Sequence, residues 1–400
     1  MTTKIITGDA RTALAAIPDG SIQCTVTSPP YFGLRSYLPT GHDGKHAELG
    51  AEPTLAEYVA NLVAVFREVR RVLRDDGTLW LNLGDSYCSH DPGGRRDGEF
   101  LNPGGRQSEE SRGARNKAGT FARGQQGLKP KDLMMVPARV ALALQDDGWY
   151  LRSKIIWHKP NPMPESCRDR PTSSYEEVFL LTKRARYYYD ADAIAEPGVQ
   201  PDRQRNDRIG GANGHTVRHS EGGMIGATTT RNARNVWTIV TSPYAAAHFA
   251  TFPPELPRRC ILAGTSERGG CPACGAPWTR VVGTAAAAPD LSQRSTSHYD
   301  TTVRYGANNG GNGGFDKLAA RMRAGEHGKL TTGWSPSCAC DAGDPVPQTV
   351  LDPFSGAGTT GLVADRLGRH YIGIELNPEY VALAEARIRN DAPMFAEVTS

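Results

Sequence analysis

Apolar residues along the chain follow two alternating spacings, one typical of amphipathic helices and one typical of buried strands. Residues 54–74 carry apolar side chains three and four positions apart, and Thr54 with Glu57 forms a capping box at the start of this predicted helix. Further helices are predicted at 137–146, at 253–263, at 359–367 and after Asn377-Pro378. Strands are predicted at 4–6, 22–26, 78–83, 149–157, 349–351 and 370–375. Residues 177–182 and 186–189 are predicted to form a β-hairpin. The alternation of strands and helices predicts an α/β fold with a mostly parallel sheet.

Three long stretches without clear periodicity interrupt this pattern, at 86–130, 196–234 and 279–334. Loops of this length inside a compact domain are usually functional or disordered. Two basic regions fall largely within them: residues 95–131 carry nine Lys/Arg against four Asp/Glu, and residues 203–234 carry six Arg against two acids. Such loops suit a phosphate backbone, and plain solvated loops remain the alternative.

The 400 residues suffice for one large α/β domain with insertions or for two modest domains, and the net charge of +3 does not by itself indicate nucleic-acid binding. No apolar stretch approaches the roughly 20 residues that span a bilayer, so no membrane association is expected. The amino terminus lacks a signal-peptide core, which predicts a cytoplasmic protein. Eight cysteines are too few for a disulfide scaffold of this size.

A glycine-rich run, Asp352-Pro353-Phe354-Ser355-Gly356-Ala357-Gly358, lies between a predicted strand and a predicted helix. Gly356 and Gly358 permit a tight bend and the close approach of a ligand to the backbone. Glu375 ends the next predicted strand, 19 residues after Gly356, where a carboxylate can accept hydrogen bonds from ribose hydroxyls. With Gly361 the run also matches Gly-x-Gly-x-x-Gly, so the motif alone leaves a nicotinamide cofactor open.

A second motif, Thr27-Ser28-Pro29-Pro30-Tyr31, follows the predicted strand 22–26. Together, and in this order along the chain, the two motifs resemble those of the β-class amino-methylating DNA methyltransferases. Family-like segments extend over nearly the whole chain, at 8–9, 27–31, 157–162, 235–237, 248–253 and 352–358. The glutamine methyltransferases, the main protein-modifying alternative, typically carry Asn-Pro-Pro-Tyr and the opposite motif order.

The resemblance implies a Rossmann-like, seven-stranded methyltransferase sheet, circularly permuted so that the chain begins at the third strand. It also implies S-adenosylmethionine as the cofactor. On this basis Asp9 would contact the adenine, Glu375 would end the second strand, and Phe252 with Pro253 would line the cofactor's other side. The full set of implied cofactor-binding residues is Asp9, Thr27, Phe252, Pro253, Asp352, Phe354, Gly356, Gly358, Thr359 and Glu375.

The residue types of Ser28–Tyr31 suit methylation of an exocyclic amine, and the four are the predicted catalytic residues. The Ser28 hydroxyl and the Pro29 carbonyl would accept hydrogen bonds from the two N–H groups of the amine. The prolines would fix the backbone, and Tyr31 would stack on the extruded base. Serine at position 28 favours N4 of cytosine, with N6 of adenine as the alternative. Carbon-5 methylation is disfavoured because it usually requires a Pro-Cys dipeptide, which the chain lacks.

Four of the cysteines form two close pairs, Cys271/Cys274 and Cys338/Cys340. This arrangement predicts one tetrahedral structural zinc ion, although four ordinary thiols or a redox pair at 271/274 would also fit. A closed four-thiolate site leaves no position for a catalytic water, so we predict no chemical role for it. The sequence leaves open whether the zinc site helps to hold DNA.

The predicted organisation has seven parts: a first catalytic segment (1–85), a flexible basic insertion (86–130), the rest of the catalytic half with the β-hairpin (131–190), a target-recognition region (191–247), a cofactor-side helix (248–270), a small zinc-ribbon-like insertion (271–340) and the cofactor-binding half (341–400). Duplex DNA is the expected partner. A homodimer is plausible from the resemblance, and any restriction endonuclease is expected to be a separate chain. A non-catalytic, zinc-containing DNA-binding protein on the same scaffold is the rival class, and the target sequence stays open.

Overall fold

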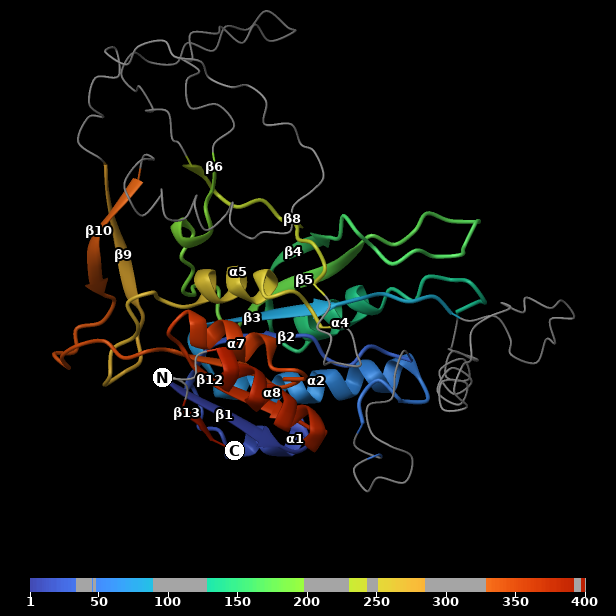
Figure 1. Ribbon diagram of the computed structural model, residues 1–400, viewed down its shortest axis with the longest axis horizontal. Helices are drawn as coiled ribbons and strands as arrows, with labels where there is room; N and C mark the ends of the chain where they lie inside the picture. The colour runs from blue at the N-terminus through green and yellow to red at the C-terminus, as the bar shows by residue number, and fades with distance from the viewer. Residues whose placement is uncertain are drawn as a thin grey trace, which may run out of the picture.

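The structure is a computed structural model, and it describes residues 1–33, 45, 48–88, 128–197, 230–242, 251–284, 329–391 and 397–399 (Figure 1). Most of the three predicted loops, and therefore most of the predicted basic insertion and target-recognition region, lie outside the described residues. The described residues form a central sheet with helices on both faces and a separate two-stranded hairpin.

The central sheet has nine strands in the order β13-β1-β12-β11-β2-β3-β5-β4-β8. Their bounds, in this order, are Glu397–Thr399, Thr2–Thr7, His370–Glu375, Thr349–Asp352, Ile22–Thr27, Leu73–Leu83, Tyr175–Thr182, Tyr150–His158 and Val236–Thr238. Every neighbouring pair is parallel except those that β5 makes with β3 and β4. The mostly parallel sheet is therefore confirmed, with the seven expected strands in the middle and two short strands, β13 and β8, added at the edges. The first strand of the chain, β1, lies two positions from β11, with β12 between them, as the permutation requires.

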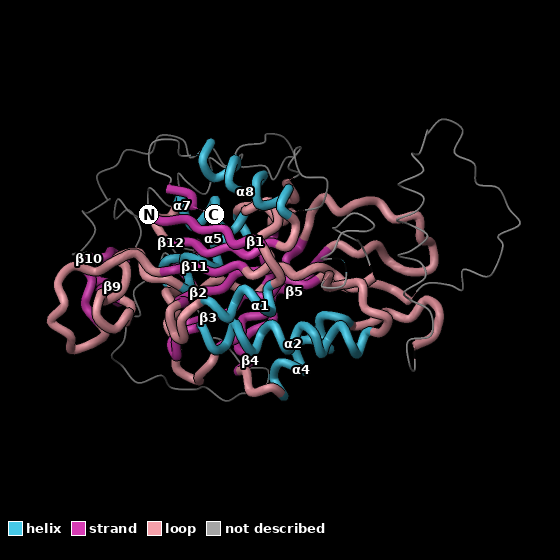
Figure 2. Tube along the Cα trace, turned by 90° about the horizontal axis from the view of Figure 1, so that it is seen from below, coloured by secondary structure: helices cyan, strands magenta, loops and turns pink. Residues whose placement is uncertain are grey.

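Helices cover the two faces of the sheet, and Figure 2 shows α1, α2 and α4 on the side opposite to α7 and α8. The first face carries α1 (Ala10–Ala13), α2 (Leu55–Val72) and α4 (Val136–Asp146), and the second carries α5 (Glu255–Gly264), α7 (Thr359–Arg366) and α8 (Pro378–Asp391). Successive residues of β3 alternate between the two cores: Leu79 and Leu81 pack with α2, and Trp80 packs with α5. Each large apolar side chain buried in this way contributes about 1.5–3 kcal/mol to the free energy that stabilises the fold. Among the described residues, no helix is long and apolar enough to cross a membrane.

A two-stranded antiparallel hairpin, β9 (Trp278–Thr284) with β10 (Lys329–Pro336), stands apart from the central sheet. In Figure 1 it lies at the end of the sheet opposite to the arrowhead of β3. A buried ion pair between Arg280 and Asp190, 3.0 Å apart, ties it to the main body. The remaining short elements are η1 (Leu14–Ala16), η3 (Asp192–Ile194) and the paired strands β6 (Glu196–Pro197) and β7 (Thr230–Arg231).

The predicted helix starts are confirmed at two caps. The Thr54 hydroxyl accepts a hydrogen bond from the Glu57 N–H at 3.2 Å, and the Asn377 side chain accepts one from the Glu379 N–H at 2.9 Å. Such caps satisfy N–H groups that a helix end leaves without intrahelical partners, which is why they are readable from local sequence.

The predicted β-hairpin of 177–182 with 186–189 is wrong. The strand around 177–182 is β5, and β3 and β4 occupy both of its hydrogen-bonding edges. A strand has only two edges, so the following residues must bond elsewhere. The Tyr188 N–H donates to the Asp76 carbonyl and the Asp190 N–H to the Ala263 carbonyl.

Candidate active site

The carboxyl ends of β1, β12, β11 and β2 meet at one edge of the sheet, because these strands are parallel. This edge, the carboxyl edge, brings together residues from both sequence motifs. The Thr27 hydroxyl donates to Oδ1 of Asp352 at 2.7 Å, which joins the motif after β2 to the motif after β11 across 325 positions of sequence. The Gly8 N–H donates to the Glu375 carbonyl at 2.9 Å, which brings the ends of β1 and β12 together.

Asp352 is a buried hub of this edge, with 1% of its surface exposed. Oδ1 also accepts the Phe354 N–H at 3.0 Å, and Oδ2 accepts the Thr360 hydroxyl of α7 at 2.8 Å. Burial raises the pKa of Asp352 to about 6, and the hydrogen bonds from Thr27, Thr360 and Phe354 oppose that rise. The residue therefore holds both motifs and α7 in register.

Replacement of Asp352 with asparagine is expected to remove a pH dependence of stability. Because the folded-state pKa of Asp352, about 6, lies above the ordinary 3.8, its stabilising contribution is present below the ordinary value and is lost as pH rises through the folded one. Asparagine cannot ionise, so the free energy of unfolding of Asp352→Asn, relative to wild type, should rise by about 2.5 kcal/mol between pH 4 and pH 8. Urea denaturation of both proteins over this range measures the difference. Parallel pH curves would contradict the assignment.

The glycine turn leaves backbone open to a ligand. Gly356 and Gly358 have φ of 51° and 72°, in the left-handed region that favours glycine. A Cβ on Gly356 would meet no atom within 4 Å, whereas one on Gly358 would lie 2.8 Å from the Ala384 Cβ. Gly356 therefore borders open space, while Gly358 permits close packing of the turn on α8. Thr359 is buried at the first position of α7, and its hydroxyl accepts a hydrogen bond from Arg387 at 2.9 Å.

The Glu375 carboxylate lies beside this open backbone. Oε2 accepts the Gly356 N–H at 2.8 Å and Oε1 accepts the Asn377 N–H at 2.9 Å. Burial raises the pKa of Glu375, and both N–H groups counteract the shift. Each oxygen keeps a further lone pair, so the carboxylate can also accept hydroxyl groups of a ribose. Open glycine backbone next to a fixed carboxylate fits a nucleoside-bearing cofactor.

The other predicted cofactor residues lie at the start of α1, before α5 and in the glycine turn. Asp9 caps α1 by accepting the Arg11 N–H at 2.9 Å, and its carboxylate is paired with the Arg11 guanidinium at 2.6 Å. Phe252 is half-buried against the core on the α5 face, and Pro253 is buried just before α5. Phe354 is partly buried against the core on the other face. The role of Phe252 and Pro253 at the cofactor stays a prediction.

The Ser28–Tyr31 segment leaves β2 at the carboxyl edge and is held from two sides. The hydroxyl of Tyr58, which is fully buried in α2, donates to the Pro30 carbonyl at 2.8 Å. On the other side the Tyr31 ring packs against Gly84, where an added Cβ would lie 2.7 Å from the ring. Pro29 is buried, while Ser28, Pro30 and Tyr31 are partly exposed. The segment is therefore a fixed loop whose serine and tyrosine remain accessible.

Three polar residues that the sequence did not single out as catalytic surround Ser28 and Tyr31. The Ser28 hydroxyl donates to the Tyr31 hydroxyl at 3.2 Å, and the Tyr31 hydroxyl donates to Oε2 of Glu176 at 2.6 Å. Asn82 contacts the same three groups through Nδ2, and Lys159 forms an ion pair with Glu176. The signal that could have revealed Asn82 is a polar residue within the otherwise apolar run 79–83.

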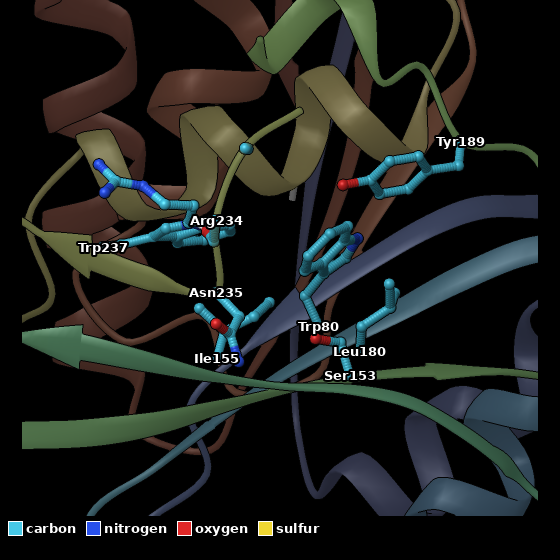
Figure 3. A pocket seen from close by; sticks show the side chains of 9 residues that line it. Trp80, Ser153, Ile155, Leu180, Tyr189, Arg234, Asn235 and Trp237 are labelled. Carbon is cyan, nitrogen blue, oxygen red and sulfur yellow. The ribbon is translucent and has the colours of Figure 1, made fainter. Parts of the chain in front are cut away.

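A small cavity lies elsewhere, on the α5 face of the sheet (Figure 3). The indole of Trp80 lies between Tyr189 and Trp237, with ring centroids 6.4 and 6.2 Å away, and Arg234 and Asn235 complete the wall. The cavity volume of about 50 Å³ is room for one or two water molecules. It is lined by none of the predicted catalytic or cofactor residues, so it is not the predicted base pocket.

The four paired cysteines come together at the base of the β9–β10 hairpin, with all four sulfurs within 4.8 Å of one another. Tetrahedral zinc with sulfur at about 2.3 Å places ligand sulfurs about 3.8 Å apart, so the four thiols fit this ion. The Arg74 guanidinium, at the amino end of β3, donates to the Cys274 carbonyl at 2.7 Å. The cluster is therefore at the opposite edge of the sheet from Ser28 and the glycine turn.

Comparison with known proteins adds an independent line of information. A family model for N6 and N4 methyltransferases, described as DNA methylase, matches residues 22–271 and 343–386. The chain is 38% identical over 382 residues to the type II methyltransferase M.XycI of Xanthomonas campestris pv. cyanopsidis, covering 96% of this chain and 86% of that protein. It is also 38% identical over 387 residues to the type II methyltransferase M.SmaI of Serratia marcescens, covering 96% and 90%. Among solved structures it is similar to PvuII DNA methyltransferase (cytosine-N4-specific), with 16% identity, a TM-score of 0.49 and coverage of 98% and 91%.

Proposed function

Because this chain belongs to the DNA methylase family of N6/N4 methyltransferases, we propose that it transfers a methyl group from S-adenosylmethionine to N4 of a cytosine extruded from duplex DNA. The observation that carries the proposal is the Ser28 hydroxyl at the carboxyl edge, in a motif that the Thr27–Asp352 hydrogen bond joins to the glycine turn. A hydroxyl there can accept a hydrogen bond from an N–H group of the target amine without carrying charge. Serine at this position, in place of aspartate, favours cytosine over adenine.

We assign some residues of the carboxyl edge to the cofactor and others to the target base. Asp9, Glu375 and the backbone at Gly356 would hold the nucleoside part of the cofactor, with Thr27, Phe252, Pro253, Asp352, Phe354, Gly358 and Thr359 shaping the site. Bound S-adenosylmethionine supplies an electrophilic methyl group on its sulfonium. Ser28 and the Pro29 carbonyl would orient the amine, whose lone pair is otherwise delocalised into the ring, and Tyr31 would stack on the base.

Reading of the target sequence is assigned to residues 191–247, with the basic insertion 86–130 as a further DNA contact. The described end of the first region carries β8, which pairs with β4 next to Lys159. Because the two strands are parallel, the residues that follow β8 lie beside Lys159, where the Thr241 N–H donates to the Asn161 side chain at 3.1 Å. These residues would reach DNA beside the base pocket. A homodimer and a separate restriction endonuclease stay predictions.

A single structural zinc ion is proposed for Cys271, Cys274, Cys338 and Cys340. The fit of the four sulfurs supports it. Their place at the edge away from Ser28 favours a structural role over one in holding DNA at the pocket.

The test of the proposed reaction is the identity of the product. The purified chain is incubated with unmethylated DNA of mixed sequence and S-adenosylmethionine, and the DNA is digested to nucleosides for mass spectrometry. N4-methylcytosine is the expected product. N6-methyladenine would overturn the choice of base, and the absence of any methylated nucleoside despite cofactor binding would overturn the reaction.

Substitution of Gly84 by alanine is expected to slow methylation by about 10- to 100-fold, because a misplacement of about 1 Å at a reacting site has costs of this size. The added Cβ would lie 2.7 Å from the Tyr31 ring, which must then shift. Single-turnover methylation measures the effect. Gly333→Ala is the matched control, since its Cβ would meet no atom within 4 Å. Equal rates in both variants would contradict a role for the Tyr31 ring position.

A further inference from the structure

The cluster of Asn82, Glu176 and Lys159 is built around the two hydroxyls of the Ser28–Tyr31 motif. All three residues come from the carboxyl edge, at the end of β3, the start of β5 and just after β4. Asn82 is only 3% exposed, and the side chains of Glu176 and Lys159 are 15% and 20% exposed. A buried carboxylate and amide beside accessible hydroxyls are costly to desolvate unless they are fully paired. Their placement therefore calls for an explanation in terms of the site.

The hydrogen bonds in this cluster run in one direction. Ser28 Oγ donates to Tyr31 Oη at 3.2 Å, and Tyr31 Oη donates to Glu176 Oε2 at 2.6 Å. Asn82 Nδ2 lies 2.7 Å from the same Oε2 and 3.0 Å from Tyr31 Oη. The reversed amide would bring two oxygens into contact at Glu176, so this orientation is the favourable one. Ser28 directs its proton at Tyr31 and accepts the Asn82 amide at 3.4 Å on one lone pair, which leaves its other lone pair for an incoming N–H donor.

We propose that Ser28, Tyr31 and Glu176 form a proton relay that carries a proton from the target amine to the Glu176 carboxylate, with Asn82 and Lys159 as positioning residues. This inference rests on the proposed function, because it needs an amine bound at Ser28. It applies equally to N4 of cytosine and N6 of adenine.

The proton balance of the step is closed within the cluster. The amine nitrogen forms the new C–N bond with its lone pair, the C–S bond breaks with its electrons going to sulfur, and one N–H proton moves to Ser28 Oγ. Ser28 passes its own proton to Tyr31 Oη, and Tyr31 passes its proton to Glu176 Oε2. The positive charge of the sulfonium and the negative charge of the carboxylate are lost together, so the net charge of the site does not change. Glu176 later releases the proton to water.

The test compares neighbouring carboxylates on opposite faces of β5. Glu176→Gln keeps the size of the side chain and an acceptor for Tyr31 but removes a proton acceptor, and should lower the single-turnover rate of methyl transfer by about 10²–10³-fold. DNA and cofactor affinities should stay within about twofold of wild type. Glu177→Gln is the control: Glu177 is paired with Lys154 at 2.6 Å and lies next in sequence, on the other face. It should keep the wild-type rate.

The conservative variant separates a relay from a packing role. Glu176→Asp retains a carboxylate in poorer geometry, so the relay predicts that it is at least about tenfold faster than Glu176→Gln. A purely structural role predicts the opposite order, because glutamine matches the shape of glutamate better. Tyr31→Phe, which keeps the ring and removes the hydroxyl, provides a second interruption of the same path. If both residues act on one path, the double variant should methylate about as slowly as the slower single variant, because the two decreases in rate do not multiply.

The outcomes are distinguishable from those of the proposed function. Wild-type protein that forms no methylated nucleoside would overturn both inferences. Wild-type protein that methylates DNA, with Glu176→Gln at an unchanged rate or with glutamine faster than aspartate, would overturn the relay alone.

Discussion

Replacement of Ser28 with alanine is expected to lower the single-turnover rate of methyl transfer by about 10²–10³-fold, the effect of losing one preorganised hydrogen-bonding group at a reacting centre. Alanine removes the acceptor for the target N–H and the first O–H of the chain that leads through Tyr31 to Glu176. The glycine turn does not depend on this hydroxyl, because Thr27 makes the connection to Asp352. Cofactor affinity should therefore stay within about twofold. Rapid-quench methylation and titration calorimetry measure the two quantities.

Ser21→Ala is the matched control for this variant. Ser21 stands just before β2 as Ser28 stands just after it, is exposed, and donates only to the Pro18 carbonyl at 2.7 Å. Its loss should leave methylation unchanged. A Ser28→Ala protein that methylates at the wild-type rate, or that loses cofactor binding in proportion to its activity, would contradict the assignment of Ser28 to the target amine.

Local signals accounted for most of the fold. A helix cap such as Thr54 and the alternation of buried and exposed residues act over a few positions, so they are readable without knowledge of the partners. The parallel arrangement followed from the same alternation, because parallel neighbours need a helical crossover between them. The two motifs of the carboxyl edge were predictable for the same reason: each directly follows a strand, and parallel strands end at one edge.

Contacts between distant strands could not be predicted in this way. Asn82 and Glu176 are 94 positions apart and meet only because β3 pairs with β5. The sequence around 177–182 carries no sign that β3 and β4 pair with both edges of that strand. For this reason the prediction that 186–189 is its partner is wrong. The polar cluster beside Tyr31 was missed for this reason, while the cysteine pairs were found because their close spacing is itself local.

Loss of one cysteine ligand is expected to remove the proposed zinc and unfold the β9–β10 hairpin, while the carboxyl edge keeps its structure. In Cys338→Ser, zinc content should fall from one per chain to nearly none, since structural zinc sites derive about 10–16 kcal/mol from the complete set of ligands in zinc-finger peptides. The cysteines lie at the base of the hairpin, and the hairpin has little apolar core of its own: Val281 and Val282 are 43% and 39% exposed. Backbone amides of β9 and β10 should therefore lose hydrogen-exchange protection, and those of β2 and β11 should retain it.

Methylation should respond to this change far less than to Ser28→Ala. The hairpin region is tied to the main body by Arg74, at the amino end of β3, and by Arg280 of β9, which pairs with Asp190. The transfer site is at the opposite edge of the sheet. Below the melting temperature, Cys338→Ser should hence methylate DNA within about threefold of the wild-type rate, because coupling between such separated parts is typically small. Cys167→Ser, a cysteine outside the cluster, should change neither zinc content nor rate. Metal analysis and single-turnover methylation measure the two effects. Wild-type protein without zinc would rule out the metal site. A methylation rate that falls in proportion to the zinc content would show that the cysteine cluster takes part in DNA methylation and is not only structural.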